Sequence, residues 1–208
     1  MSWLDRLRTR PTEATGPEGE PGEEASAAFE RASPGLAALF GVMKPERAHS
    51  ILDLGEASRR HLAVLSPYAR QIRFAGLVPT PPAGDALRVA LERLPPNADH
   101  PYDIVLAWDV LDRLGPPDRK ALLERVTKLT APGARLYASV DTSGAETIQP
   151  VRWTLVSVDR ISQEPVGAPE RAKPVLLPAQ AERMLDPFKV THAFSLRVGA
   201  REYVATRG

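Results

Sequence analysis

Blocks of apolar and polar residues alternate along this chain in a pattern that predicts strands and helices in turn. The clearest block spans residues 102–140, where two short apolar runs, at 103–107 and 134–140, flank a polar crossing and an amphipathic stretch. The apolar residues of that stretch recur at helical spacing and are Leu122, Leu123, Val126 and Leu129. A strand, a helix and a second strand in this order predict one unit of a parallel sheet.

The same patterns predict further elements on both sides of this block. These are helices at 34–43, 61–65, 85–94 and 178–185, and strands at 50–55, 71–77, 151–158, 189–196 and 201–206. Gly199 suits a hairpin turn between the last two strands, and the Pro- and Gly-rich remainder of 141–174 is expected to be a loop or lid. The seven strands predict a three-layer α/β sandwich around a mostly parallel seven-stranded sheet with a C-terminal antiparallel hairpin.

The N-terminal part of the chain lacks this periodicity. Residues 1–10 are predicted to form a short amphipathic helix, whose apolar face carries Trp3, Leu4 and Leu7. This face can dock on the domain itself, on a partner or on a membrane surface. Residues 11–24 are rich in Pro, Gly and Glu and are predicted to be a disordered linker, because they cannot bury enough apolar surface to offset their chain entropy. The ordered domain is therefore expected at 25–208.

Composition narrows the classes of function. The 208 residues include 27 Lys and Arg against 26 Asp and Glu without a basic patch, so we expect no nucleic-acid partner. There is no cysteine, no apolar run of the roughly 20 residues that span a bilayer and no secretory leader pattern, so a cytoplasmic protein is expected. The four histidines (His49, His61, His100 and His192) lack the spacing of metal ligands, so no metal site is predicted.

Two candidate site segments follow apolar strands, at positions that a parallel sheet brings to one edge. Asp53 and Gly55 close the first predicted strand. A glycine lets the backbone approach a ligand closely, and a carboxylate can bind an ammonium group. Trp108 and Asp109 close the third, where an aromatic ring can stack on a ligand and the acid can accept a hydrogen bond from an amine. In the alternative interpretation, Trp108 packs in the core and Asp109 caps the next turn.

Three stretches resemble class I methyltransferase domains that use S-adenosylmethionine. They are the block at 102–140, the loop D-L-G-E-A-S at 53–58 and the C-terminal run at 187–207, so the resemblance extends from about residue 50 to the end. The resemblance implies a Rossmann-like fold, S-adenosylmethionine as cofactor and methyl transfer to an unknown acceptor. The residues that it assigns to cofactor binding are Asp53, Gly55, Glu56, Ala57, Trp108 and Asp109.

Two positions depart from the family pattern. Arg59 stands where the loop motif has a glycine. The strand at 71–77 lacks the acid that in the family binds the ribose hydroxyls, and the nearest carboxylate is that of Asp85. Losing such a contact weakens binding about tenfold or more. These departures favour an alternative function, in which an inactive methyltransferase fold acts as a binding or scaffold module and residues 1–10 tether a partner.

Overall fold

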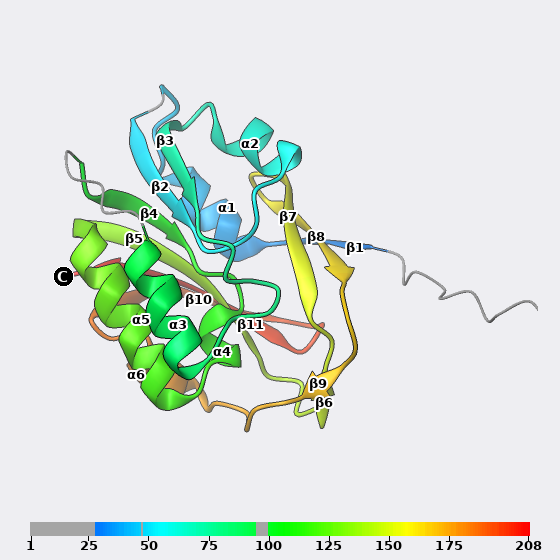
Figure 1. Cartoon of the computed structure of the whole chain (residues 1–208). Helices are drawn as coiled ribbons and strands as arrows, with labels where there is room; N and C mark the ends of the chain where they lie inside the picture. Colours follow the sequence, from blue (N-terminus) through cyan, green and yellow to red (C-terminus); the bar gives the residue numbers. More distant parts are fainter. Residues whose placement is uncertain (1–27, 47, 95–99) are drawn as a thin grey trace, which may run out of the picture.

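The computed structural model describes residues 28–46, 48–94 and 100–208 (Figure 1). The segments predicted at 1–10 and 11–24 lie outside these ranges. Within the described part of the chain, no helix is both long enough and apolar enough to cross a membrane.

A mixed six-stranded sheet forms the centre of the molecule, with the strand order β10-β11-β5-β4-β2-β3. The strands are β2 (His49–Asp53), β3 (Ala69–Phe74), β4 (Tyr102–Leu106), β5 (Thr130–Asp141), β10 (Phe188–Leu196) and β11 (Ala200–Arg207). Strands β2 to β5 are parallel, and β11 runs antiparallel to both β5 and β10. The carboxyl ends of the four parallel strands therefore meet at one edge of the sheet.

The predicted seven-stranded sheet is wrong by one strand. The segment predicted at 151–158 does form a strand, β7 (Val151–Ser157), but this strand belongs to a separate antiparallel sheet. Apolar alternation predicts that a strand forms but does not identify its partner, because pairing depends on segments distant in the chain. The C-terminal hairpin is confirmed, and Gly199 lies in its turn with a φ of 73°.

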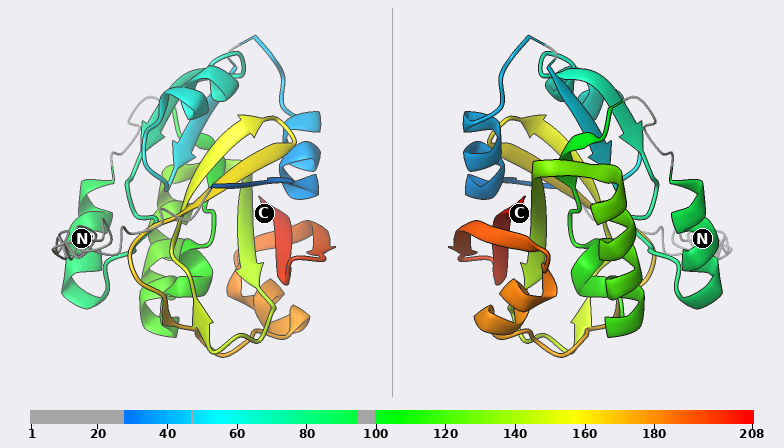
Figure 2. Two further views of the ribbon diagram at one scale, coloured as in Figure 1. Left: turned by 90° about the vertical axis from the view of Figure 1, so that its right-hand side faces the viewer. Right: turned by 90° about the vertical axis from the view of Figure 1, so that its left-hand side faces the viewer.

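Helices cover both faces of the central sheet. They are α1 (Pro34–Gly41), α2 (Arg59–Leu65), α3 (Gly84–Arg93), α4 (Val110–Arg113), α5 (Pro116–Leu129) and α6 (Pro178–Met184). Helix α1 packs on β5, β10 and β11, while α3 and α5 pack together on the opposite face (Figure 1, Figure 2). The result is the predicted arrangement of three layers.

A small antiparallel sheet lies beside the parallel strands (Figure 1). Its order is β1-β8-β7, with β1 at Phe29–Ala32 and β8 at Arg160–Pro165, and a ribbon of β6 (Thr147–Ile148) and β9 (Glu170–Arg171) completes this region. The expected loop or lid within 141–174 is therefore wrong in part. The short polar strand β8 is stabilised by pairing with β7 and with β1 from the other end of the chain, which local periodicity cannot reveal.

A buried polar network fixes the small sheet to the central one. Glu202 of β11 is fully buried and accepts hydrogen bonds from Arg31 Nη1 at 2.6 Å, Ser33 Oγ at 2.9 Å, Gly35 N at 2.9 Å and Tyr137 Oη at 3.0 Å. Burial and the nearby Glu202 charge raise the pKa of Tyr137, so its hydroxyl remains a donor. This network holds β1 and the start of α1 against β5 and β11.

Candidate functional site

Asp53, the last residue of β2, is fully buried, and both of its carboxylate oxygens face groups of this chain. Its Oδ1 accepts hydrogen bonds from Gly55 N at 2.8 Å and from Trp108 Nε1 at 2.6 Å. Its Oδ2 lies 3.2 Å from Nδ1 of the equally buried His61 in α2. Oδ1 is therefore satisfied by internal donors, whereas Asp53 Oδ2 and both ring nitrogens of His61 are buried without a hydrogen-bond partner among the described residues.

Gly55 provides space for a side chain of the same protein. A Cβ atom at this position would lie 3.0 Å from Trp108 Nε1 and 3.0 Å from Asp53 Oδ1, closer than side chains normally approach. Trp108 is fully buried and has a φ of 50°, a left-handed conformation that bulky residues rarely adopt. The backbone conformation at the end of β4 and the missing side chain at Gly55 together allow the indole to lie over the glycine loop.

The Trp108 ring belongs to a stacked series of side chains in the crevice. It stacks on His61 with ring centroids 5.4 Å apart and on Trp153 of β7 at 5.7 Å, with interplanar angles of 20° in both pairs. His61 in turn stacks on Phe74 at 6.2 Å, and the guanidinium of Arg31 lies over the Trp153 ring at 5.7 Å. These five side chains, the aromatic column, connect the end of β3 with the small sheet.

The small sheet is also bound directly to both candidate segments. Arg152 Nε donates to Glu56 Oε2 at 2.9 Å, and Trp153 Nε1 donates to Asp109 Oδ1 at 2.9 Å. Strand β7 packs against α2, which follows the glycine loop. Glu56 and Ala57 themselves remain exposed on the outside of this contact. The small sheet thus covers the space over Gly55 that the Trp108 ring occupies.

Asp109 has an unusual environment at the start of α4. It is the N-cap residue of that helix, but its side chain makes no capping hydrogen bond. Burial raises the pKa of Asp109 to about 6, although the Arg113 charge, 3.9 Å away, and the hydrogen bond from Trp153 both favour the ionised form. The carboxyl group is therefore harder to ionise than that of an ordinary aspartate. Asp109 therefore occupies the N-cap position, as the alternative interpretation predicts, but its side chain does not cap the helix.

A cavity of about 320 Å³ lies beside the aromatic column, between the small sheet and the ends of β4 and β5. The charged and aromatic residues that line it include Arg31, Asp109, Asp112, Arg113, Asp141 and Trp153. Of these, the sequence pattern indicated only Asp109. Arg31, Asp141 and Trp153 were missed because β1, β7 and the end of β5 meet only in the folded chain, whereas Asp112 and Arg113 follow Asp109 within one helical turn, a proximity that could have indicated them.

The two departures from the family pattern have different consequences in the structure. Arg59 is exposed at the first position of α2, so its side chain does not fill the crevice. At the end of β3, the backbone N–H of Gly76 donates to Gly55 O at 3.0 Å, and no carboxylate follows the strand. The Asp85 side chain is 95 % exposed and pairs with Arg88 at 3.1 Å, so it does not replace the missing acid.

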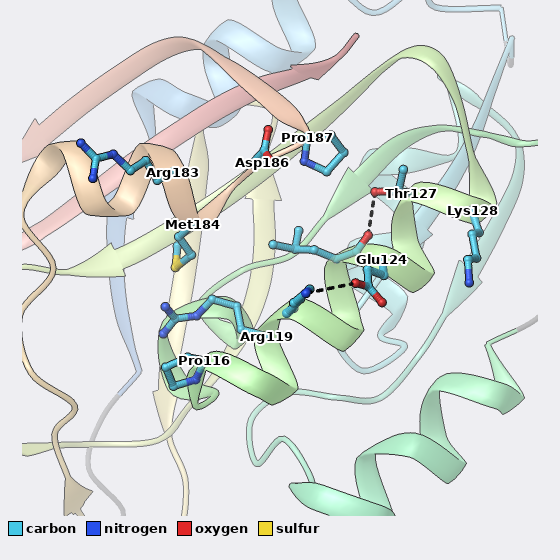
Figure 3. Close-up of a pocket in the computed structure, with 11 residues that line it drawn as sticks. Pro116, Arg119, Glu124, Thr127, Lys128, Arg183, Met184, Asp186 and Pro187 are labelled. Atoms are coloured by element: carbon cyan, nitrogen blue, oxygen red, sulfur yellow. Dashed lines mark hydrogen bonds and ion pairs between the residues drawn. The ribbon is translucent and has the colours of Figure 1, made fainter.

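A larger cavity, of about 670 Å³, lies between α5 and α6 (Figure 3). Figure 3 shows basic side chains around it, among them Arg119, Lys128 and Arg183. Lys120 Nζ lies 3.9 Å from Glu124 Oε1 along α5. Arg119, also in its wall, donates to the carbonyl oxygens of Leu111 and Leu114 and is thereby used to hold α4. Its lining includes none of the six residues assigned to the cofactor, so this cavity is separate from the candidate site.

In this arrangement, Trp108 occupies the space over Gly55 and the carboxylate expected for the ribose is absent from the end of β3, so the residues do not accommodate the cofactor that the resemblance implies. Asp53 Oδ1 accepts from internal donors, whereas its Oδ2 has no hydrogen-bond partner among the described residues. The geometry gives Asp53, Gly55, Glu56, Trp108 and Asp109 internal contacts. Their assignment to cofactor binding stays a prediction.

Comparisons with known proteins leave the family open. No family model and no curated protein matches the chain. Among solved structures it is similar to the pyocyanin biosynthetic protein PhzM (16% identity, TM-score 0.47, covering 84% of this chain and 54% of that one). It is also similar to 1,6-didemethyltoxoflavin-N1-methyltransferase of Burkholderia thailandensis (18%, 0.48, 84% and 76%) and to the glycopeptide N-methyltransferase MtfA (14%, 0.49, 86% and 95%). The chain thus spans about half the length of PhzM. All three TM-scores are below 0.5.

Proposed function

We propose that this chain is a methyltransferase-like α/β domain that works as a binding module rather than as a methyltransferase. The observation that carries the proposal is the position of Trp108. Its ring lies over Gly55, donates to Asp53 and stacks between His61 and Trp153. A methyl donor held over Gly55 needs the same space.

The free energy needed to vacate this space is large compared with that of a typical cofactor contact. Removing Trp108 breaks a hydrogen bond to a carboxylate, worth about 1.5–3 kcal/mol. It also exposes a buried aromatic side chain, at about 1.5–3 kcal/mol. Together these costs lower the affinity of a competing ligand by about two to four powers of ten. The missing ribose contact lowers the affinity by about one further power of ten.

Methyl transfer is the second candidate function, and the exposure of the glycine loop favours it. Glu56, Ala57 and Arg59 are all exposed, so the outer part of the loop is open. Entry of a cofactor then requires Trp108 to leave the column and the small sheet to move with it. The resemblance at 53–58 and 102–140 supports this candidate at the level of the fold only.

Calorimetric titration with S-adenosylmethionine and S-adenosylhomocysteine tests the proposal. We expect no saturable binding of either ligand to the wild-type protein at concentrations up to about 1 mM, given the affinity loss calculated above. Micromolar binding that disappears in Gly55→Arg would contradict the proposal. The Gly55→Arg variant serves as the control because its side chain enters the same space.

A further inference from the structure

We propose that the cavity of about 320 Å³ between the small sheet and the ends of β4 and β5 binds a small zwitterion. Its anionic group pairs with Arg31 and its ammonium group with Asp109. The inference rests on the proposed function, because it supplies the ligand of the binding module.

The position of the cavity is typical of a ligand site. It lies outside the carboxyl ends of two neighbouring parallel strands, where ligands bind in α/β sheets. Residues of β1 and β7 close it from the other side, and Phe29 and Val198, each 53% exposed, line its mouth. Its volume is at the lower end of the range for ligand pockets and suits a molecule of a few carbon atoms.

Arg31 supplies the site for an anion. Its side chain is 6% exposed and is held by Gln163 at 3.2 Å and Glu202 at 2.6 Å. Its Nη2 has no hydrogen-bond partner among the described residues, although it is buried. A buried guanidinium nitrogen without an acceptor is unfavourable, and the carboxylate of a ligand in the cavity removes this cost.

Three carboxylates, those of Asp109, Asp112 and Asp141, also line the cavity, together with the guanidinium of Arg113. Asp109 Oδ1 accepts from Trp153, whereas its Oδ2 is 3.9 Å from the Arg113 guanidinium, which is beyond hydrogen-bond distance. Asp112 lies next to Asp141, whose backbone N–H donates to Asp112 Oδ2 at 2.9 Å. An ammonium group in this region gains the hydrogen bonds that Asp109 still accepts. A simple anion there would face three carboxylates against the single guanidinium of Arg113, which already pairs with Glu170 at 2.8 Å.

Trp153 fixes the spacing of the two charged groups. The Arg31 guanidinium lies over its ring, 5.7 Å from the centroid, and Asp109 binds the Nε1 of the same ring. Cation and carboxylate thus contact the face and the edge of the same indole ring. A short amino acid beside this ring can meet both groups, whereas a ligand with a single charge satisfies only one of them.

Indole N–H resonances provide a local measurement of binding. The chain has three tryptophans, Trp3, Trp108 and Trp153, whose cross-peaks in a ¹H–¹⁵N spectrum can be assigned with single Trp→Phe variants. The wild-type protein is titrated with γ-aminobutyrate, with butyrate, which lacks the amine, and with butylamine, which lacks the carboxylate. We expect γ-aminobutyrate to shift the Trp153 peak and to bind at least about tenfold tighter than either single-charge analogue.

Variants locate the two contacts. Asp109→Asn keeps the size and the oxygen that faces Trp153, and we expect it to weaken γ-aminobutyrate at least about tenfold. Arg31→Lys keeps a positive charge beside Glu202 but removes the guanidinium fork, and we expect a similar loss. If Arg31→Lys fails to fold, Asp109→Asn tests the site by itself. Arg60→Lys, on a side chain that is 68% exposed, is the matched control and should change nothing.

Several results would overturn the inference. These are no shift of the Trp153 peak up to about 50 mM γ-aminobutyrate, equal affinity for butyrate or butylamine, or unchanged affinity in Asp109→Asn. A titration of the same sample with S-adenosylhomocysteine separates this outcome from a failure of the proposed function. A saturable shift of the Trp108 peak contradicts the binding module, whereas the response of Trp153 to the amino acid decides the inference alone.

Discussion

At the scale of single residues, Trp108 decides what can enter the crevice over Gly55. The sequence placed Trp108 correctly at the end of a strand but left open whether its ring faces a ligand or packs in the protein. The structure shows the ring fully buried and bound to Asp53 at 2.6 Å. A glycine loop in a sequence is therefore compatible with two structures, because the space over the glycine can hold a cofactor or a side chain of the same protein.

Trp108→Phe tests the hydrogen bond within the column. Phenylalanine keeps an aromatic ring but removes the donor, so Asp53 Oδ1 retains only the Gly55 N–H. We expect the free energy of unfolding to fall by about 1.5–3 kcal/mol, as for other hydrogen bonds to charged groups. Chemical denaturation measures this change. Val89→Ala, at a side chain that is 47% exposed, is the control and should change stability by less than about 0.5 kcal/mol.

Gly55→Ala tests how closely Trp108 approaches the loop. The added Cβ would lie 3.0 Å from both Trp108 Nε1 and Asp53 Oδ1, so the ring must shift. We expect a loss of about 1–3 kcal/mol in the free energy of unfolding, typical of overpacking. Gly41→Ala is the matched control, because an added Cβ there meets nothing within 4 Å. Equal stability of both variants would show that Trp108 does not rest on Gly55.

Asp109 gives stability a defined pH dependence. Its pKa is about 6 in the folded protein against an ordinary value of 3.8, so the folded state binds the proton more tightly. The protonated carboxyl group therefore stabilises the folded protein relative to the ionised group. This contribution to the free energy of unfolding is complete below about pH 4 and is lost as the pH rises through 6. We expect the difference in unfolding free energy between wild type and Asp109→Asn to fall by up to about 3 kcal/mol from about pH 4 to pH 7. A difference that stays constant with pH would contradict this environment for Asp109.

At the scale of elements, the small sheet determines the shape of the site. Its strand β7 carries Trp153, which meets Trp108 and Asp109, while β1 carries Arg31. The sequence predicted β7 but not β1 or β8, since short strands with polar residues resemble loops until their partners are known. Arg31, the cavity residue on β1, was missed for the same reason.

Glu202→Gln tests the network that fixes β1 to the central sheet. The substitution leaves the Arg31 guanidinium buried without its carboxylate, and it places an amide group among donors. We expect a loss of about 3–5 kcal/mol in the free energy of unfolding, as when one partner of a buried ion pair is removed. Glu30→Gln is the control, because Glu30 pairs with Arg60 at the surface, 3.9 Å away, and should cost less than about 1 kcal/mol.

At the scale of the whole molecule, periodicity predicted the order of the main elements and the three layers. Runs of apolar residues such as 103–107 and 134–140 are long enough to indicate buried strands, and the helix between them has a clear stripe. The number of strands in the main sheet could not be predicted, because pairing is set by tertiary contacts. The state of the crevice could not be predicted either, because it depends on Trp153, 45 positions after Trp108.

A crystal structure of the wild-type protein soaked with S-adenosylhomocysteine tests the closed crevice most directly. At about 5 mM ligand, far above the affinity of a working cofactor site, we expect Trp108 to remain over Gly55 with its Nε1 bound to Asp53. No ligand density should appear in that space. Density for the nucleoside over Gly55, with the Trp108 ring turned out of the column, would contradict the proposal that this crevice is closed by the protein itself.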